Sequence, residues 1–498
     1  MTLHGLLVSP DDMELFAVAS GDVNPLHVSA EYARRTPFGE PVVYGVLAAL
    51  GASAQLRERP GSAVESFALE FLGPLLVGIP YRVEIEEDDS TARVRVSDLG
   101  QPALDATIAF AEGRLRPALP EGRPEARAAP TTLDLESLNE GRTAAGVWAP
   151  SLAHLRRLLE LWGLPARGVD ELAVTALAWA SYLVGMELPG ERATFWKLDL
   201  RLASASETPS LPLAYTAEVT RRDDRVGLVE LAATLGDGLV TATLSAFVRE
   251  ESPRPDPDKL AALVADTPGL AGRVAVVVGG SRGLGAAIAQ ALALRGAHVI
   301  LVYRDSAVEA GRIRDSLVGD PGTIEPIQGD AGDAEWCREI LRPLVDTRGG
   351  LDLLVCNASP AIRPLRFDAG TFERFVGFVH ESVGLVAAAL AAFLDDLDAR
   401  SGTALVVSSS ALTTLPSEWP HYVTAKAAVE GLASWAAAAH PRVRLVVVRP
   451  PKLLTDQMNS LLGRVGAARV EPVAAAIVRH LGRPRANAPV PELVELEP

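Results

Sequence analysis

The segment PGSAVESFALEF, residues 60–71, decides the fold of the first half of this chain because it occurs twice. It aligns without a gap on PGERATFWKLDL, residues 189–200, and the alignment places Leu69 on Leu198. Both segments alternate apolar with polar residues, which is typical of a strand with one buried face. A second alternating segment follows each copy, YRVEIEE after the first and AYTAEVT after the second. We therefore predict an internal duplication of a unit that contains a helix and a curled antiparallel sheet.

The length of 498 residues predicts roughly three domains of about 150 residues each. Two charged, Pro-rich segments without apolar periodicity are typical of linkers, RPALPEGRPEARAAP (116–130) and ESPRPDPDK (251–259). We therefore predict domains over residues 1–115, 131–250 and 268–498.

Composition and charge exclude several classes of function. With 48% hydrophobic and 22% charged residues the chain resembles a soluble globular protein, and no apolar stretch approaches the roughly 18 residues of a membrane span. A net charge of −16 without clustered Lys and Arg argues against a nucleic-acid surface. The first residues lack the basic and apolar regions of a signal peptide, and the chain has only two cysteines. We expect a cytoplasmic protein that binds no membrane and no nucleic acid.

The stretch SGDVNPLH, residues 20–27, places Asp22 and His27 five residues apart around Asn24 and Pro25. Asp, Asn, Pro and Gly are turn formers, so one interpretation is a solvated loop whose His caps a local group. The other interpretation is an active site, because a carboxylate beside an imidazole can fix its tautomer and raise its basicity toward a bound water. The Asn-Pro pair favours the active site.

The second copy lacks this polar set. The duplication alignment, extended backwards without a gap, pairs Asp22 with Ser151, His27 with Arg156 and Gly45 with Val174. We therefore predict that the second unit is a degenerate copy.

SGDVNPLH, followed by FGEPVVYGVLAALGAS (38–53), resembles the MaoC-like, R-specific enoyl-thioester hydratases, which have the hotdog fold. The resemblance implies a double hotdog over the two copies, and one water held and activated by an Asp and a His. It implies the following positions in this chain: Asp22 and His27 on the water, Asn24 in the loop, the Gly45 N–H on the thioester carbonyl, and Ser53 as a further active-site residue. Tyr44 departs from the family, since a His commonly precedes that Gly.

Residues 268–498 alternate continuously apolar strand patterns with helical patterns, which indicates a parallel sheet covered on both faces. The first strand, VAVVV, runs into the turn Gly279-Gly280-Ser281-Arg282-Gly283-Leu284-Gly285. Such a turn lets the backbone approach a pyrophosphate, although Gly-rich turns also occur as plain helix starts. The predicted fold class is an α+β double hotdog followed by an α/β Rossmann-type, doubly wound parallel sheet.

Tyr422 and Lys426 form a sharper signal. Lysine occurs at only four positions in the chain, and one of them stands four residues after a Tyr, on the same face of a predicted helix. A nearby ammonium stabilises a phenolate, so Tyr422 can exchange a proton with a substrate oxygen while a hydride moves at carbon. Ser409, at the end of the preceding strand segment ALVVSS, can hydrogen-bond the same oxygen.

These features resemble the short-chain dehydrogenase/reductase family over essentially the whole third segment. The resemblance implies Tyr422 as acid and base, Lys426 as ribose anchor, and Ser409 as carbonyl ligand. It implies a nicotinamide cofactor on these positions: Gly279, Ser281, Arg282, Gly283, Leu284, Gly285, Arg304, Asp330, Ala331, Asn357, Ala358, Lys426 and Thr455. Arg304, aided by Arg282, favours NADPH over NAD, because an Arg at the end of the second strand binds a phosphate; Asp305 weakens this preference. No metal site is predicted.

Several positions depart from the family pattern. Ser359 and Pro451 each replace a Gly, and Val278 replaces a Thr. The helix position that usually holds a proton-relay Asn is Glu381, with His380 beside it. Either residue relays the proton, or the reductase site is impaired.

The combination predicts NADPH-dependent reduction of a 3-oxoacyl thioester and dehydration of the product to the 2-enoyl thioester, as in fatty-acid or polyketide synthesis. The acyl group would be carried on acyl carrier protein or coenzyme A. Two alternatives stay open: hydration followed by oxidation, and a ketoreductase whose double hotdog is a binding and dimerisation scaffold. Both families usually pair subunits, so we expect a homo-oligomer by analogy.

Overall fold

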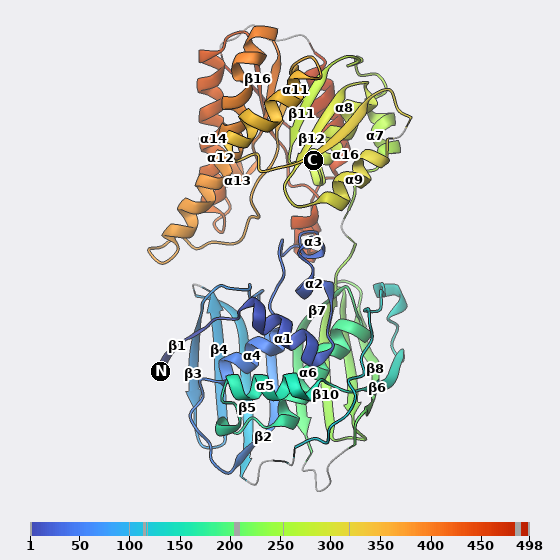
Figure 1. Cartoon of the computed structure of the whole chain (residues 1–498), viewed down its shortest axis with the longest axis vertical. Coiled ribbons are helices and arrows are strands. Elements are labelled where there is room, and N and C mark those ends of the chain that lie inside the picture. The colour runs from blue at the N-terminus through green and yellow to red at the C-terminus, as the bar shows by residue number, and fades with distance from the viewer. Residues whose placement is uncertain are drawn as a thin grey trace. The chain divides into compact units, whose positions relative to one another are not determined.

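Two separate sheets organise the chain, one antiparallel and one parallel (Figure 1). They belong to two units, Met1–Glu251 and Ser252–Pro498. The computed structural model describes residues 2–98, 100–112, 116, 118–203, 210–251, 253–317, 319–483 and 490–496. An antiparallel sheet with central helices, followed by a parallel sheet covered by helices, confirms the predicted fold class.

The ten-stranded sheet of the first unit is made of two five-stranded halves. The first half contains β1 (Thr2–Leu6), β2 (Ser62–Phe71), β3 (Tyr81–Glu87), β4 (Thr91–Asp98) and β5 (Gln101–Glu112). The second half contains β6 (Thr143–Trp148), β7 (Ala193–Leu202), β8 (Leu213–Asp223), β9 (Leu228–Leu235) and β10 (Val240–Val248). The strand order is β1-β3-β4-β5-β2-β7-β10-β9-β8-β6. From the outer edge inward, the order β1-β3-β4-β5-β2 of the first half therefore corresponds to the order β6-β8-β9-β10-β7 of the second half.

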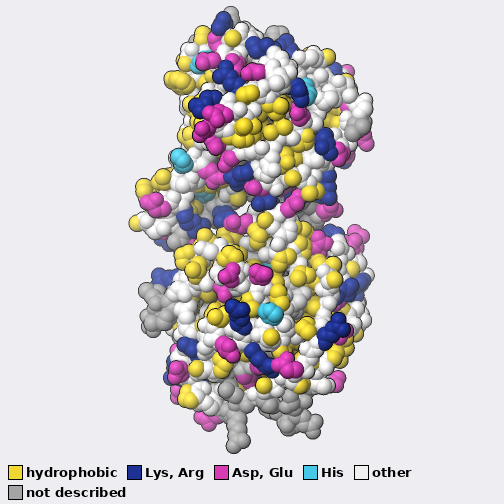
Figure 2. All heavy atoms as spheres, in the orientation of Figure 1, with side chains coloured by type: hydrophobic (Ala, Val, Ile, Leu, Met, Phe, Trp, Pro, Cys, Tyr) yellow, Lys and Arg dark blue, Asp and Glu magenta, His cyan; other side chains and the backbone are white. Residues whose placement is uncertain are grey.

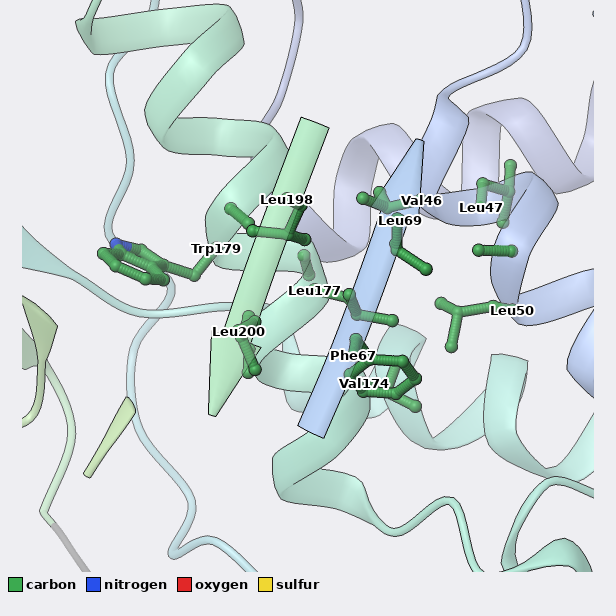
Figure 3. Close-up of a cluster of buried hydrophobic side chains, with 14 of the residues drawn as sticks. Val46, Leu47, Leu50, Phe67, Leu69, Val174, Leu177, Trp179, Leu198 and Leu200 are labelled. Atoms are coloured by element: carbon green, nitrogen blue, oxygen red, sulfur yellow. The ribbon is translucent and has the colours of Figure 1, made fainter. Parts of the chain in front are cut away.

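The two halves join where β2 pairs with β7. Leu69 lies directly opposite Leu198 in this antiparallel pair, and these are the residues that the sequence alignment equates. A local twofold axis therefore passes between them. Figure 3 shows Phe67 and Leu69 on one strand and Leu198 and Leu200 on the other, all buried among helical side chains.

Two apolar helices fill the inside of this sheet. The helices of the first unit are α1 (Pro10–Ser20), α2 (Pro25–Val28), α3 (Ala30–Ala33), α4 (Gly45–Ser53), α5 (Leu152–Leu161) and α6 (Glu171–Tyr182), with a π turn over Leu183–Glu187 and short 3₁₀ turns over Leu135–Ser137 and Pro165–Arg167. Helices α4 and α6 are hydrophobic on every side, which is typical of helices surrounded by core. Figure 3 shows them against the joined strands, with the labelled side chains Val46, Leu47, Leu50, Val174, Leu177 and Trp179.

The gapless sequence alignment of the two halves does not hold for the residues that precede α4 and α6. Ser151 is the N-cap residue of α5, whereas Asp22 lies beyond the C-terminus of α1. Residues 21–44 connect α1 to α4, but only residues 162–170 connect α5 to α6. The predicted equivalence of Asp22 with Ser151 is therefore wrong, as is that of His27, because the second half has a much shorter connection.

The second unit has a seven-stranded parallel sheet in the order β13-β12-β11-β14-β15-β16-β17. Its strands are β11 (Val274–Val278), β12 (His298–Tyr303), β13 (Thr323–Gln328), β14 (Leu353–Cys356), β15 (Thr403–Val407), β16 (Arg444–Arg449) and β17 (Glu492–Glu495). Its α-helices are α7 (Pro257–Val264), α8 (Gly283–Leu294), α9 (Ala307–Asp315), α10 (Ala334–Trp336), α11 (Arg342–Asp346), α12 (Phe372–Arg400), α13 (Ala411–Thr414), α14 (Pro420–Ala439), α15 (Leu461–Arg464) and α16 (Val470–Leu481). A π turn spans Cys337–Leu341, and a 3₁₀ turn spans Asp456–Met458.

Helices cover both faces of this sheet, which explains why its strands are continuously apolar. One core cluster joins the sheet to α7, α8 and α16, and a second joins its other face to α11, α12 and α14. The strand order turns at β11, because β12 lies on one side of it and β14 on the other. In open sheets of this kind ligands bind at such a point, beyond the carboxyl ends of the strands.

Helix α12 is the one helix of the described residues long and apolar enough to cross a membrane by length and composition. Part of this apolarity belongs to the core, because Leu385, Ala389 and Phe393 are buried against the sheet. The expected absence of a membrane partner stays a prediction. On the face shown in Figure 2, acidic and basic side chains are interspersed over both units.

Candidate active sites

The loop that follows α1 is shaped by its own polar groups. Gly21 ends the helix with a φ of 71°, a left-handed conformation that glycine adopts readily. Asn24 starts the next helical turn, because its side chain accepts a hydrogen bond from the Leu26 N–H at 3.0 Å. The backbone of SGDVNPLH therefore forms a turn stabilised by polar groups, as its composition predicts, and Asp22 and His27 lie in this turn.

Asp22 is a buried carboxylate held from both halves of the sheet. Its Oδ2 accepts a hydrogen bond from the Ser181 hydroxyl at 2.7 Å, and its Oδ1 accepts one from the Asn24 N–H at 3.1 Å. A Cβ atom on Gly185 would lie 2.7 Å from Oδ1, so only glycine fits there. Burial raises the pKa of Asp22 to about 6, and the hydrogen bonds from Ser181 and Asn24 oppose this rise.

His27 lies in the same cavity with its ring fixed. Its Nδ1 lies 2.7 Å from the Val42 carbonyl oxygen, so Nδ1 carries the proton and donates it, which leaves Nε2 as an acceptor. Burial lowers the pKa of His27 to about 4, the Val42 hydrogen bond raises it, and Arg249 lowers it further. At neutral pH His27 is a neutral imidazole with one free lone pair.

Tyr44 connects these two groups. Its hydroxyl donates to the Asp22 carbonyl oxygen at 2.7 Å, and its ring stacks on His27 with a centroid separation of 4.0 Å. Tyr44 is fully buried. Where the related family commonly has a His, this chain therefore has an aromatic support beneath its own histidine.

Gly45 is the first residue of α4 and lines the cavity that contains Asp22 and His27. A Cβ atom at this position would lie 2.5 Å from Cδ1 of Phe71, so a side chain would displace that ring. The first N–H groups of a helix have no intrahelical acceptor and favour negative charge. A thioester oxygen that gains charge can bind there.

The cavity has a volume of about 360 Å³ and draws its walls from both halves of the sheet. The first half contributes the loop that carries Asp22 and His27 and the end of β2. The second half contributes the π turn and the start of β7. Its aromatic lining consists of Phe38, Phe71, Phe195, Trp196 and Phe247. Asn24 joins the halves, since its Nδ2 donates to the Gly185 carbonyl at 2.8 Å.

Ser53, which the resemblance places in the site, does not line the cavity. Its hydroxyl donates to the Ala49 carbonyl at 2.7 Å within α4. The duplication alignment equates Ser53 with Tyr182, the neighbour of Ser181. The hydroxyl beside Asp22 therefore comes from the other half, and it was missed because it stands in an otherwise apolar helix about 160 residues away.

In the second half, a buried ion pair lies beside a residue that the alignment equates with the cavity lining. Asp170 caps α6 and pairs with Arg116 at 3.0 Å, with both side chains largely buried. Arg116 also donates to the Val64 carbonyl oxygen at 3.0 Å, and Val64 is the residue that the alignment equates with cavity-lining Ala193. The ion pair of Arg116 with Asp170 therefore contacts the counterpart of one residue of the cavity wall.

In the second unit, the glycine turn packs tightly between β11 and α8. Gly279 has a φ of 76°, and a Cβ atom there would lie 2.7 Å from the Ala358 Cα. The Asn357 side chain donates to the Gly279 carbonyl at 2.9 Å, and a Cβ atom on Gly285 would lie 2.5 Å from the same side chain. The turn ends at Gly283, the first residue of a twelve-residue helix. Glycines that keep side chains out of a turn at a helix N-terminus fit a dinucleotide pyrophosphate.

The other predicted cofactor positions surround this turn. Thr455 approaches it, because its Cγ2 would lie 3.2 Å from a Cβ atom on Gly283. Asp330 follows β13 and accepts a hydrogen bond from the Gly332 N–H at 2.8 Å. Ser281, Leu284 and Ala331 are buried, and the side chain of Leu284 belongs to the core.

Ser409, Tyr422 and Lys426 meet at the carboxyl end of β15. The phenol of Tyr422 is hydrogen-bonded to Ser409. The Lys426 ammonium donates to the Val407 carbonyl at 2.8 Å and lies 5.6 Å from the centre of the Tyr422 ring. Tyr422 and Lys426 share one face of α14, as their spacing predicts.

Burial acts on both ionisable groups of this set. It lowers the pKa of Lys426 to about 8 and raises that of Tyr422, while the hydrogen bond to Ser409 opposes the rise for Tyr422. Tyr422 is therefore a protonated phenol at neutral pH, able to donate a proton to a substrate oxygen.

Glu381 and His380 are exposed on α12. The Glu381 carboxylate accepts a hydrogen bond from the Arg304 guanidinium at 3.2 Å. The residue of α12 whose ring faces the reactive phenol is Phe378, with a centroid separation of 6.4 Å from Tyr422. Glu381 therefore contacts Arg304, which is one of the predicted cofactor residues.

A family model described as short chain dehydrogenase matches residues 273–463, and one described as MaoC like domain matches residues 2–101. A short-chain dehydrogenase/reductase of Cladobotryum sp is 32% identical over 196 residues, which cover 38% of this chain and 74% of that protein. A cyclohexanol dehydrogenase of Rhodococcus sp. is 30% identical over 222 residues, which cover 40% of this chain and 82% of that protein.

Part of the chain is also similar to solved structures. An alcohol dehydrogenase from the archaeon Thermococcus sibiricus, complexed with 5-hydroxy-NADP, is 27% identical with a TM-score of 0.41. That match covers 45% of this chain and 95% of the dehydrogenase.

Proposed function

The chain belongs to the short-chain dehydrogenase/reductase family, joined to an N-terminal MaoC-like domain, and from this premise we propose that it reduces a 3-oxoacyl thioester with NADPH and dehydrates the product to the 2-enoyl thioester. The observation that carries the proposal is the presence of two assembled reactive sets in one chain. Asp22, His27 and Gly45 line one cavity, and Ser409, Tyr422 and Lys426 meet at one strand end.

The dehydration site works through a neutral imidazole and a helix N-terminus. In the hydration direction, Nε2 of His27 accepts a proton from a water that Asp22 orients, and the water oxygen bonds to Cβ of the enoyl thioester. The electron pair moves to the thioester oxygen, which accepts a hydrogen bond from the Gly45 N–H. The proton on His27 then passes to Cα, and dehydration retraces these steps.

The reduction site supplies a proton and holds the substrate carbonyl. Tyr422 donates its phenolic proton to the C3 oxygen, and Ser409 donates a hydrogen bond to the same oxygen. The positive charge of Lys426 stabilises the phenolate that remains. A bound dihydronicotinamide would supply the hydride to C3. Burial keeps Tyr422 protonated at neutral pH, so this phenol can act as the proton donor in the reduction.

The residues present fit a nicotinamide dinucleotide. Gly279 and Gly285 let the turn pack closely against Ala358 and Asn357, and Asn357 fixes the turn, so that the N–H groups at the start of α8 would bind a pyrophosphate. Arg304 and Arg282 are the cations that would favour NADPH. The two proposed reactions act on consecutive species, since the product of the reductase is the substrate of the dehydratase, and the acyl carrier is acyl carrier protein or coenzyme A.

The test is NADPH oxidation with a short 3-oxoacyl thioester, with the products followed by mass spectrometry. We expect the wild type to yield the enoyl thioester and Asp22→Asn to stop at the 3-hydroxyacyl stage. Tyr422→Phe should abolish NADPH oxidation and still dehydrate an added 3-hydroxyacyl thioester. If the wild type stops at the hydroxyacyl stage, the double hotdog is a scaffold and the proposed dehydratase is wrong.

A further inference from the structure

Arg304 is held by two carboxylates at the end of the second strand of the parallel sheet. It is the first residue after β12, and its Nε donates to Asp305 Oδ2 at 3.0 Å. Its Nη1 donates to Glu381 Oε1 at 3.2 Å. Asp305 is its neighbour in the chain, whereas Glu381 comes from α12, far away in the sequence. The cation proposed to recognise a phosphate therefore already has an anion on each side.

Helix α12 reaches this place because it passes over the ends of the neighbouring strands. Leu385, one turn after Glu381, lies beside the loop that follows β13, since its Cδ2 would be 3.7 Å from a Cβ atom on Gly332. The same loop contains Asp330, one of the predicted adenosine residues. Glu381 thus approaches Arg304 from the side on which the adenosine of a dinucleotide is expected.

The second cation of the region is held in the same way. Arg282, in the glycine turn, donates to Asp456 at 3.2 Å. A phosphate binds Arg best through two parallel N–H groups. Arg304 cannot present both of its outer N–H edges to a phosphate while Asp305 and Glu381 occupy them. A 2′-phosphate must therefore displace a carboxylate, and the longer, exposed side chain of Glu381, which reaches Arg304 from another helix, is the one that we expect to leave.

We propose that Glu381 is a specificity-determining residue of the cofactor site. Its carboxylate competes with the 2′-phosphate of NADPH for Arg304 and so reduces the preference of the site for NADPH over NADH. The inference rests on the proposed nicotinamide site. NADH has a ribose hydroxyl in place of the phosphate, and a hydroxyl can donate to a carboxylate without displacing it. Glu381 thus weakens the binding of NADPH and not that of NADH. The helix position that usually holds a proton-relay Asn in the related family therefore affects cofactor preference in this chain.

The test measures equilibrium binding of NADPH and NADH to the full chain, by fluorescence or calorimetry, without turnover. Glu381→Gln should lower the Kd for NADPH about twofold to fivefold, the upper part of the range for solvent-exposed ion pairs, and leave the Kd for NADH unchanged. The gain should shrink when ionic strength is raised, because the pair is exposed. Glu373→Gln, an exposed acidic residue in the first turn of the same helix, is the matched control and should change neither Kd.

The Arg304→Ala background decides whether the effect passes through this pair. There Glu381→Gln should have no effect on NADPH binding, because the group for which it competes is gone. Weaker or unchanged NADPH binding by Glu381→Gln alone, or an equal gain in the Arg304→Ala background, would overturn the proposal while leaving the reductase intact. A wild type that binds neither dinucleotide would overturn the reductase assignment as well, and so is a distinct result.

Discussion

The two halves of the first unit share one sheet and differ in one connection. In the first half residues 21–44 carry Asp22 and His27 between two helices, whereas in the second half residues 162–170 make only a short turn. The second half nevertheless supplies Ser181 to the carboxylate of the first. The second half therefore has no long connection like that of the first half, but it contributes a hydrogen bond to the Asp22 carboxylate.

The largest expected effect separates the reactive half from the other one. Asp22→Asn should slow hydration of a 2-enoyl thioester about 1,000-fold, because the amide lacks the negative charge that orients the attacking water and stabilises the protonated His27. Asp170→Asn, which changes the buried acid at the start of α6 in the second half, should leave the rate unchanged. The absorbance of the enoyl thioester reports both rates. Equal losses from the two substitutions would contradict the assignment of chemistry to one half.

The next effect concerns the buried ion pair in the second half. Arg116→Ala should lower the free energy of unfolding by about 3 kcal/mol, because it leaves the Asp170 carboxylate buried without its cation. Urea denaturation measures this loss. Arg82→Ala breaks an exposed pair with Glu84 and should cost no more than about 1 kcal/mol. A loss for Arg116→Ala as small as for this control would show that the pair does not stabilise the second half.

Asp22 should also destabilise the half that uses it. Its pKa rises from 3.8 to about 6 on folding, so the charged carboxylate is disfavoured in the native state by about 2–3 kcal/mol at pH 7. Asp22→Asn should therefore raise the free energy of unfolding at pH 7. The gain should disappear as the pH falls from about 6 to below 3.8, where the carboxyl is protonated in both states. Thermal unfolding across this range checks the sign, and a gain that persists at the acid end would rule out the charge as its cause.

The smallest effect tests the contribution of the second half directly. Ser181→Ala removes a hydrogen bond that stabilises the Asp22 carboxylate, so the pKa of Asp22 should rise further, by about one unit. The acid limb of the pH profile for hydration should move to higher pH by the same amount. Ser53→Ala removes a buried hydroxyl at the end of α4 that does not line the cavity, and its profile should match the wild type. Identical profiles for all three proteins would mean that Ser181 does not tune the carboxylate.

The sequence predicted the elements whose pattern is local. Alternation and repetition in residues 60–71 and 189–200 identified β2 and β7 and aligned Leu69 with Leu198, which the structure then places opposite each other. Continuous apolar runs identified the parallel sheet, because strands buried on both faces show no alternation. The spacing of Tyr422 and Lys426 placed both on one face of a helix.

The sequence could not predict contacts between distant segments. Ser181 stands in an apolar helix, and nothing nearby marks it as the partner of a carboxylate in the first half. Ser53 has the neighbours expected of a site residue, but the twofold arrangement of α4 and α6 puts the other end of α4 at the cavity. The ion pair of Arg304 with Glu381 likewise depends on where α12 crosses the strand ends.

The pairing of β2 with β7 has a consequence for any shortened form of this chain. Residues 1–115 alone would leave β2 as an edge strand, because the backbone groups between Ser66 and Glu70 that now bond to β7 would lose their partners, while β2 would still pair with β5. Such an edge invites pairing with another copy, and the local symmetry offers a register with Leu69 opposite Leu69. We expect this fragment to self-associate into a homodimer with one continuous sheet. Fusion into a single polypeptide thus replaces an assembly that depends on concentration with one that does not.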